Sequence, residues 1–304
     1  MSVEMPQIVQ KNVNLKELST WRVGGCAEYF CRPTLLVEIE QACRWALSQA
    51  LDITVLGGGS NILISDNGIK GLVLCMRDFA KILEVKEDEK KIYIKAEAGT
   101  KKSEILKLFL KRNLSPALFL AGLPGDVAGG VVMNAGVAEK IIPREFVEIV
   151  EEFEVLKYEG DQVKVVKYCN QEIEWEYRHT NGWQPGVIVS VTLSWKLEPD
   201  NEIREKVKLA NQIRLQKQPL KQPSCGSTFR NPDGDKAGRL IEQAGLKGFK
   251  IGGAQVSEKH ANFIVTEEGA TAKDIKRLMD HIINTVQQKF GIQLQSEVIP
   301  LGEW

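Results

Sequence analysis

Two glycine-rich segments are the clearest candidates for ligand chemistry in this chain. One is Val55-Leu56-Gly57-Gly58-Gly59-Ser60-Asn61, which follows a predicted strand, and the other runs from Gly122 to Gly136. Because glycine has no side chain, successive backbone N–H groups can converge there on an anion such as a pyrophosphate. Either segment alone could be only a turn, but two of them in one half of the chain favour an extended, phosphate-bearing ligand.

The first segment is not a Rossmann dinucleotide loop. That fingerprint needs another glycine at position 62 and a helix directly afterwards. The chain has Ile62 at that position, and Ile62-Leu63-Ile64 is typical of a strand. Neither segment contains the Gly-Lys-Ser/Thr of a P-loop nucleotidase, so any dinucleotide must be bound in another way.

The two segments, together with Thr20-Trp21-Arg22-Val23-Gly24-Gly25, resemble the FAD-binding part of the UDP-N-acetylenolpyruvoylglucosamine reductase (MurB) family. The similarity runs from about residue 15 to residue 300. It implies an α+β protein, in which a PCMH-type FAD-binding fold of two subdomains is followed by a C-terminal α+β substrate domain. The span between Arg178 and Lys217 lacks the tyrosine-bearing insertion of one branch of the family, which places the chain in the second branch. The FAD contacts that the resemblance implies are Gly57, Gly58, Gly59, Ser60, Asn61, Gly122, Pro124, Gly125, Asn134 and Gly136.

Reducing an enolpyruvyl ether requires a hydride at C3, a proton at C2 and a group that stabilises the negative charge formed between the two events. No side chain donates a hydride, so a flavin or a nicotinamide must supply it. The resemblance assigns enolate stabilisation to Arg178 and proton donation to Ser227, and it places Glu297 beside them. Thr180 stands where the family usually has serine, and its hydroxyl is retained. For the UDP-sugar, the resemblance points to Arg214, Lys217 and Asn231.

The implied activity is the NADPH-dependent reduction of UDP-N-acetylglucosamine enolpyruvate to UDP-N-acetylmuramate in peptidoglycan precursor synthesis. FAD would be the cofactor, and NADPH and the enolpyruvyl substrate would use one pocket in turn. A second interpretation is a PCMH-type flavin oxidase that acts on another alcohol or sugar. That interpretation gives no purpose to Arg178, Ser227 and Glu297 together. A third is a non-catalytic flavin-binding or nucleotide-sugar-binding protein, against which the presence of all three counts.

Regular elements must hold these residues in place. Apolar spacing predicts a helix from Leu36 to Leu47 and a buried strand from Ile53 to Leu56, directly before the first glycine segment. Alternation predicts a strand from Gly186 to Leu197, and the segment Gly122 to Gly136 is predicted to lack regular structure. An apolar stripe from Ile275 to Phe290 predicts the closing helix. The domains expected are 1–75 and 76–198 for FAD and 199–304 for the substrate, with a boundary near Pro199.

Composition excludes several classes of protein. The 304 residues are 43% apolar and 26% charged, with 40 basic and 40 acidic residues. This balance favours neither a nucleic-acid partner nor membrane insertion, and no apolar run approaches the roughly 20 residues that a membrane span needs. Without a recognisable secretion signal, a cytoplasmic location with reduced thiols is expected, and no obligate protein partner is inferred. The six cysteines include no CxxC pair, so no metal site is expected, and Cys225 is interpreted as a small side chain in a tight loop.

Overall fold

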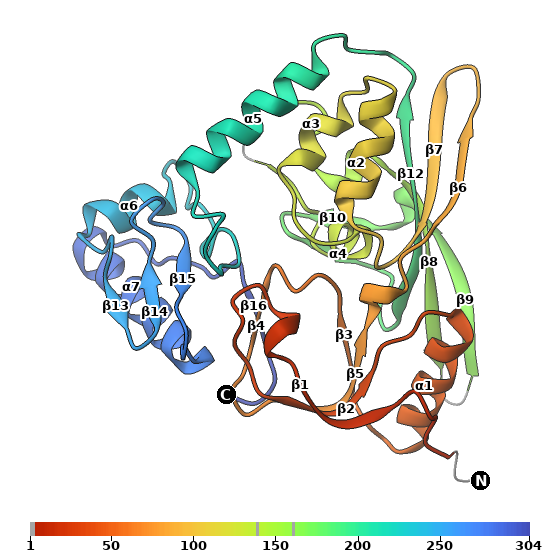
Figure 1. The fold of residues 1–304 in the computed structure, drawn as a ribbon, viewed down its shortest axis with the longest axis horizontal. Helices are drawn as coiled ribbons and strands as arrows, with labels where there is room; N and C mark the ends of the chain where they lie inside the picture. Colours follow the sequence, from red (N-terminus) through yellow and green to blue (C-terminus); the bar gives the residue numbers. More distant parts are fainter. Residues whose placement is uncertain (1–3, 138–139, 160–161) are drawn as a thin grey trace. The chain divides into compact units, whose positions relative to one another are not determined.

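The computed structural model describes residues 4–137, 140–159 and 162–304, and it confirms the α+β class. The chain forms two compact units (Figure 1). The first unit comprises Met1–Gln10, Tyr29–Gly58 and Gly71–Gln212, and the second comprises Lys11–Glu28, Gly59–Lys70 and Ile213–Trp304. The first glycine segment is therefore divided between the units after Gly58. The three functional domains predicted from the sequence remain a prediction.

A five-stranded antiparallel sheet is the largest element of the first unit. Its strand order is β6-β7-β12-β8-β9. The bounds are Ile82–Glu87 for β6, Lys91–Glu97 for β7, Val150–Glu159 for β8, Gln162–Cys169 for β9 and Val187–Lys196 for β12. Val191 of the central strand pairs with Ala96 on one side and with Phe153 on the other. The strand predicted at Gly186 to Leu197 is thus confirmed as the centre of this sheet.

One face of this sheet is apolar because strand side chains alternate between the two faces. Ile92, Ile94, Phe153 and Val191 pack in one core with residues of α2 (Lys102–Lys111), α3 (Pro116–Ala121) and α4 (Val127–Val132). The prediction that Gly122 to Gly136 lacks regular structure is wrong for α4. Asp126 starts this short helix, since its Oδ1 accepts the Gly129 N–H at 2.7 Å and so caps the first turn.

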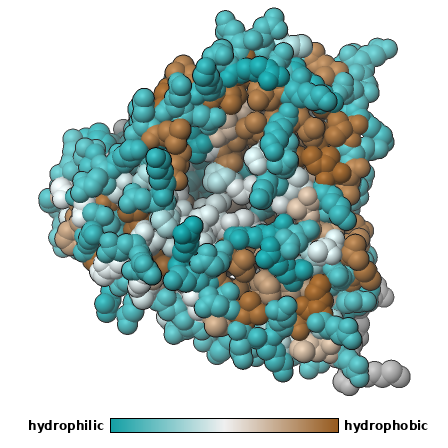
Figure 2. All heavy atoms as spheres, viewed as in Figure 1, coloured by the Kyte–Doolittle hydropathy of each residue, from teal (hydrophilic) through white to brown (hydrophobic). Residues whose placement is uncertain are grey.

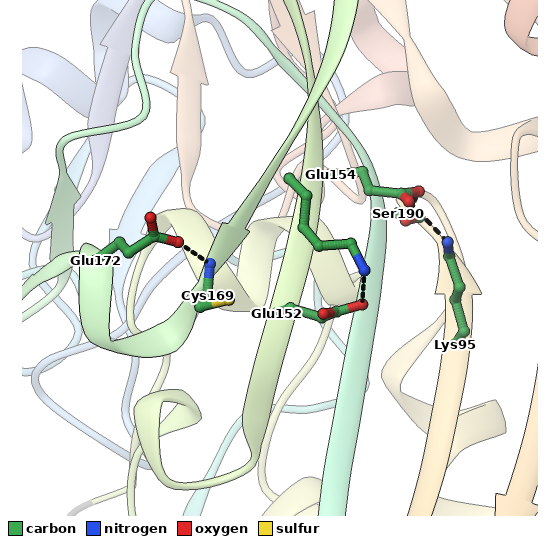
Figure 3. Close-up of polar contacts among 7 residues, drawn as sticks. Lys95, Glu152, Glu154, Cys169, Glu172 and Ser190 are labelled. Carbon is green, nitrogen blue, oxygen red and sulfur yellow. Dashed lines mark hydrogen bonds and ion pairs between the residues drawn. The ribbon is translucent and has the colours of Figure 1, made fainter.

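Polar side chains lie at the alternate strand positions of the same sheet. Glu154 on β8 accepts hydrogen bonds from Lys95 on β7 at 2.8 Å and from Ser190 on β12 at 2.6 Å (Figure 3). On the next strand, β9, Lys167 donates to Glu152 at 2.8 Å. These cross-strand pairs support a single register for the sheet, and the sheet in turn fixes the loops at its ends.

A second sheet has the strand order β1-β2-β5-β3. The bounds are Gln10–Asn14 for β1, Cys26–Cys31 for β2, Ile53–Leu56 for β3 and Ile69–Cys75 for β5. In the first unit, β3 runs parallel to β5, with Leu56 opposite Cys75. Helix α1 (Leu36–Ser48) buries Ile39, Cys43 and Trp45 in the core that Leu72 and Leu74 share. The predicted helix and strand before the first glycine segment are therefore confirmed, and Gly57 directly follows β3.

The second unit contains a small three-stranded sheet and two complete α-helices. Its antiparallel strands are β13 (Lys250–Ile251), β14 (Ala254–Val256) and β15 (Ile264–Thr266), and its helices are α6 (Ala237–Gln243) and α7 (Ala272–Phe290). The predicted stripe of α7 is buried from Ile275 to Val286, but Phe290 at its end is exposed. Thr271 accepts the Asp274 N–H at 3.1 Å and so caps the helix. A parallel pair, β4 (Ile62–Ile64) and β16 (Ile299–Leu301), joins the segment after the first glycine loop to the end of the chain.

The remaining helix, α5 (Ile203–Lys217), spans the boundary between the units. Within the described ranges, no helix is long and apolar enough to cross a bilayer. On the face drawn in Figure 2, hydrophilic residues predominate and apolar residues lie between them.

Candidate functional site

In the first unit, an arginine and an aspartate hold the start of the first glycine segment from different sides. Arg77, in the short 3-10 helix Met76–Asp78 that follows β5, donates from Nε to the Gly57 carbonyl at 3.2 Å and from Nη2 to the Gly58 carbonyl at 3.0 Å. The Gly58 N–H donates to Oδ2 of Asp126 at 2.5 Å. Both carbonyls and one amide of this loop therefore have fixed directions.

The same aspartate brings the second glycine segment against the first. A Cβ built on Gly57 would overlap the Asp126 carboxylate, and one built on Gly58 would lie 2.8 Å from the Cα of Gly125. Gly125 has a φ of +87°, a conformation that favours glycine. Two backbones thus approach each other more closely than any side chain would allow.

This geometry fits a phosphate-bearing group. A trans peptide places its carbonyl and its N–H on opposite sides, so a carbonyl held by a donor directs the following N–H the other way. Arg77 holds the Gly58 carbonyl, and in the second unit Thr20 donates to the Gly59 carbonyl from its N at 3.0 Å and its Oγ1 at 3.3 Å. The N–H groups of Gly59 and Ser60 accordingly each point away from the donor that holds the preceding carbonyl.

The first unit also brings Arg178 beside the end of the second glycine segment. Arg178 is in the two-residue turn between β10 (Glu174–Glu176) and β11 (His179–Asn181), with a φ of 58°. Its Nη2 donates to the Gly136 carbonyl at 2.9 Å. The buried Asn134 side chain donates to the Glu176 carbonyl at 3.1 Å and accepts the Val147 N–H at 3.1 Å. The hairpin that carries the arginine is therefore fastened to the glycine segment.

In the second unit, the segments that carry Ser227 and Glu297 run side by side. The Glu297 N–H donates to the Thr228 carbonyl at 2.9 Å, and the Asn61 side chain donates to the Glu297 carbonyl at 3.0 Å. Ser227 is exposed, whereas Glu297 is half-buried. Nearby, burial raises the pKa of Cys225 to about 12, and its Sγ contacts the Ile62 carbonyl at 3.6 Å. This thiol packs in the core, in agreement with its interpretation as a small structural side chain.

The residues expected to bind the UDP-sugar lie in two places in the second unit. Arg214 and Lys217 are in the last turn of α5, three residues apart and hence on neighbouring parts of the helix surface. Asn231 is exposed, and its Oδ1 accepts the N–H of Ala237, the first residue of α6, at 3.1 Å. The Asn231 side chain thus has a local structural contact, and its predicted role remains a prediction.

Sequence reasoning assigned no part in the site to Arg77, Asp126 or Lys102. Lys102 is 5% exposed, and its Nζ donates to the carbonyl of Pro124, in the second glycine segment, at 2.9 Å. The one available sequence signal was Asp126 directly before an apolar run, which is a helix N-cap pattern. Nothing near Arg77 in the sequence indicates that it contacts glycines about 20 residues earlier.

Comparisons with known proteins show the family to which the chain belongs. Residues 27–166 match the family described as "FAD binding domain", and residues 218–301 match "UDP-N-acetylenolpyruvoylglucosamine reductase, C-terminal domain". The reductase of that name from Moorella thermoacetica is 39% identical over 297 residues, which cover 97% of this chain and 94% of the relative. The one from Prochlorococcus marinus is 39% identical over 296 residues, which cover 96% and 93%.

A solved structure gives the same result for the fold. The crystal structure of UDP-N-acetylenolpyruvylglucosamine reductase (MurB) from Thermus caldophilus superposes with a TM-score of 0.76 at 31% identity, covering 96% of this chain and 98% of that one. The resemblance drawn from the glycine segments is confirmed by these matches over nearly the whole chain. The chain therefore belongs to the UDP-N-acetylenolpyruvoylglucosamine reductase family.

Proposed function

We propose that this protein reduces UDP-N-acetylglucosamine enolpyruvate to UDP-N-acetylmuramate with NADPH as the reductant and FAD as the cofactor, in the synthesis of peptidoglycan precursors in the cytoplasm. The main support is the family match at 39% identity over 97% of the chain. The residues described above are compatible with FAD, because fixed main-chain amides and glycines that admit no Cβ suit its pyrophosphate.

FAD, once reduced by a hydride from NADPH, would supply the hydride for C3 of the enolpyruvyl group. The protein's own side chains have the other tasks. Arg178, which is permanently charged and fastened to the Gly136 carbonyl, holds the substrate carboxylate and stabilises the enolate. A rigid attachment matters here, since a preorganised donor need not reorient as charge develops.

Ser227 delivers the proton to C2, and Glu297 acts from the adjacent segment. A serine hydroxyl is a weak acid, but C2 becomes strongly basic once hydride has arrived. The exposed position of Ser227 suits a group that must reach a substrate atom, and the backbone hydrogen bond from Glu297 to Thr228 keeps the two segments in register.

The test separates the two half-reactions. In Ser227→Ala, NADPH should still bleach the flavin absorbance, whereas product formation should fall about 100- to 1,000-fold because the proton donor is missing. Ser224→Ala is the matched control, a hydroxyl of the same loop without an assigned role, and it should keep wild-type turnover.

Three outcomes would contradict the proposal. Unchanged product formation in Ser227→Ala would remove serine as the proton donor. Oxidation of an alcohol or sugar, with no substrate-dependent NADPH consumption, would indicate a flavin oxidase instead. Wild-type protein that binds FAD and the UDP-sugar but consumes no NADPH would be a binding protein.

A further inference from the structure

We propose that Asp126 is a positioning residue for the cofactor: its carboxylate ties Gly57-Gly58 to Pro124-Gly125, while Arg77 holds the same glycines by their carbonyls. This inference rests on the FAD binding proposed above. In this arrangement, the Gly58 N–H is used inside the protein, so the amides offered to the pyrophosphate begin at Gly59. Gly57 and Gly58 serve as the part of the loop that is clamped.

Asp126 has contacts that a helix cap alone would not need. One carboxylate oxygen accepts the Gly129 N–H at 2.7 Å, which caps α4, and the other accepts the Gly58 N–H at 2.5 Å, from a residue 68 positions earlier. A single side chain therefore joins the two glycine segments. Its exposed fraction is 5%, so solvent does not compete for either oxygen.

The backbone around Asp126 is anchored as well, which makes the carboxylate a fixed point. The Val127 N–H donates to the Thr100 carbonyl at 3.0 Å, and the Lys102 N–H donates to the Gly125 carbonyl at 3.1 Å. Because the aspartate cannot shift, the hydrogen bond to Gly58 transmits this rigidity to the first glycine segment. Preorganised donors bind an anion more tightly than mobile ones, since less ordering is required on binding.

A buried carboxylate near a pyrophosphate would repel it unless its charge is offset. Here two amides donate to the carboxylate, and the buried ammonium of Lys102, whose Nζ donates to the Pro124 carbonyl at 2.9 Å, is close enough to interact with it electrostatically. The guanidinium of Arg77 adds positive charge on the carbonyl side of the same peptides. Asp126, Lys102 and Arg77 together thus offer main-chain amides to a ligand, while the negative charge of the Asp126 carboxylate is neutralised inside the protein.

The experiment measures FAD affinity of the FAD-free protein by quenching of flavin fluorescence. Asp126→Ser keeps a hydroxyl that can cap α4 but cannot reach both amides, and Asp126→Asn keeps the shape but gives only one acceptor oxygen. Both should weaken FAD binding about 10-fold or more, as should Arg77→Lys, which keeps the charge but loses the fork that holds two carbonyls. ADP, which carries the diphosphate without the flavin ring, should lose affinity by a similar factor in competition.

Two controls separate positioning from general stability. Arg32→Lys alters a neighbouring exposed arginine that pairs with Asp78, and it should leave FAD affinity unchanged. Thr271→Ala removes the cap of α7, and it should lower the melting temperature without changing FAD affinity. Asp126→Ser should show the reverse of Thr271→Ala. It should lose much of its FAD affinity, while the melting temperature of the FAD-free protein stays within a few degrees of wild type.

The inference is overturned if the Asp126 variants and Arg77→Lys bind FAD within threefold of wild type. It is also overturned if the Asp126 variants bind FAD more tightly, since the carboxylate would then act by repulsion. A wild-type protein that binds neither FAD nor ADP would overturn the proposed function itself, and this inference with it.

Discussion

Replacing Lys102 with methionine should make the FAD-free protein more stable at neutral pH. Lys102 is 5% exposed, its Nζ lies 5.4 Å from the centre of the Phe146 ring, and burial lowers the pKa of its ammonium from 10.5 to about 8, although Asp126 opposes this change. The folded protein therefore carries a cation with little access to water. Methionine fills a similar volume without charge, so the desolvation cost disappears.

The magnitude follows from the two pKa values. A native pKa of about 8 against 10.5 in the unfolded chain means that the charged lysine costs about 3 kcal/mol at pH 7. The substitution also removes the hydrogen bond to the Pro124 carbonyl, a loss of about 1 kcal/mol. We expect Lys102→Met to be about 2 kcal/mol more stable at pH 7.

The stability difference between Lys102→Met and the wild type should shrink as the pH rises. Above pH 8 the native lysine releases its proton while the unfolded chain still binds one, so wild-type stability rises as the pH approaches 10.5. The cost of the charge falls to about 1 kcal/mol at pH 10, and the variant and the wild type should then have nearly equal stability. Buried thiols change wild-type stability in the opposite direction, because burial raises the pKa of Cys31 and Cys43 to about 12. Their effect cancels in the difference between the two proteins.

The assay is urea unfolding of both FAD-free proteins at pH 7, 8.5 and 10. Lys107→Met is the matched control, since Lys107 is on the same helix but is exposed and pairs with Glu104 on the surface. Its difference from wild type should be small and independent of pH. A Lys102→Met protein that is less stable than wild type at pH 7, or whose difference stays constant up to pH 10, would refute the reasoning.

Three further substitutions test the packing and the site. Gly130→Ala should destabilise the protein by about 1–3 kcal/mol in urea unfolding, because its Cβ would overlap the Phe146 ring; an unchanged midpoint would contradict this. Thr180→Val should cost about 1–3 kcal/mol, since it removes the acceptor of the buried Trp183 indole N–H at 3.0 Å, whereas Thr180→Ser should be nearly neutral. Arg178→Lys should lower turnover about 100-fold with NADPH still bleaching the flavin, and equal loss of both half-reactions would place the arginine elsewhere in the mechanism.

Local patterns in the sequence were sufficient for the family and for the main helices and strands, although they missed the short helix α4. The alternation around Val191 predicted the central strand of the large sheet, and the stripe on α7 predicted the closing helix, because both depend on which side of one element is buried. Glycine runs beside apolar strands likewise marked the two loops, since only glycine permits the close backbone approach found at Gly58 and Gly125.

Only the tertiary structure decided which groups fix those loops. Asp126 accepts a hydrogen bond from Gly58, 68 residues earlier, and Arg77 donates to carbonyls about 20 residues before it. Lys102 is buried and donates to the Pro124 carbonyl of the second segment. Each of these side chains is ordinary in its local sequence, where a cap, a surface arginine or a helix lysine would be expected. Their roles arise from pairs of residues that meet only after the strands and helices have packed, and periodicity within one element carries no information about such pairs.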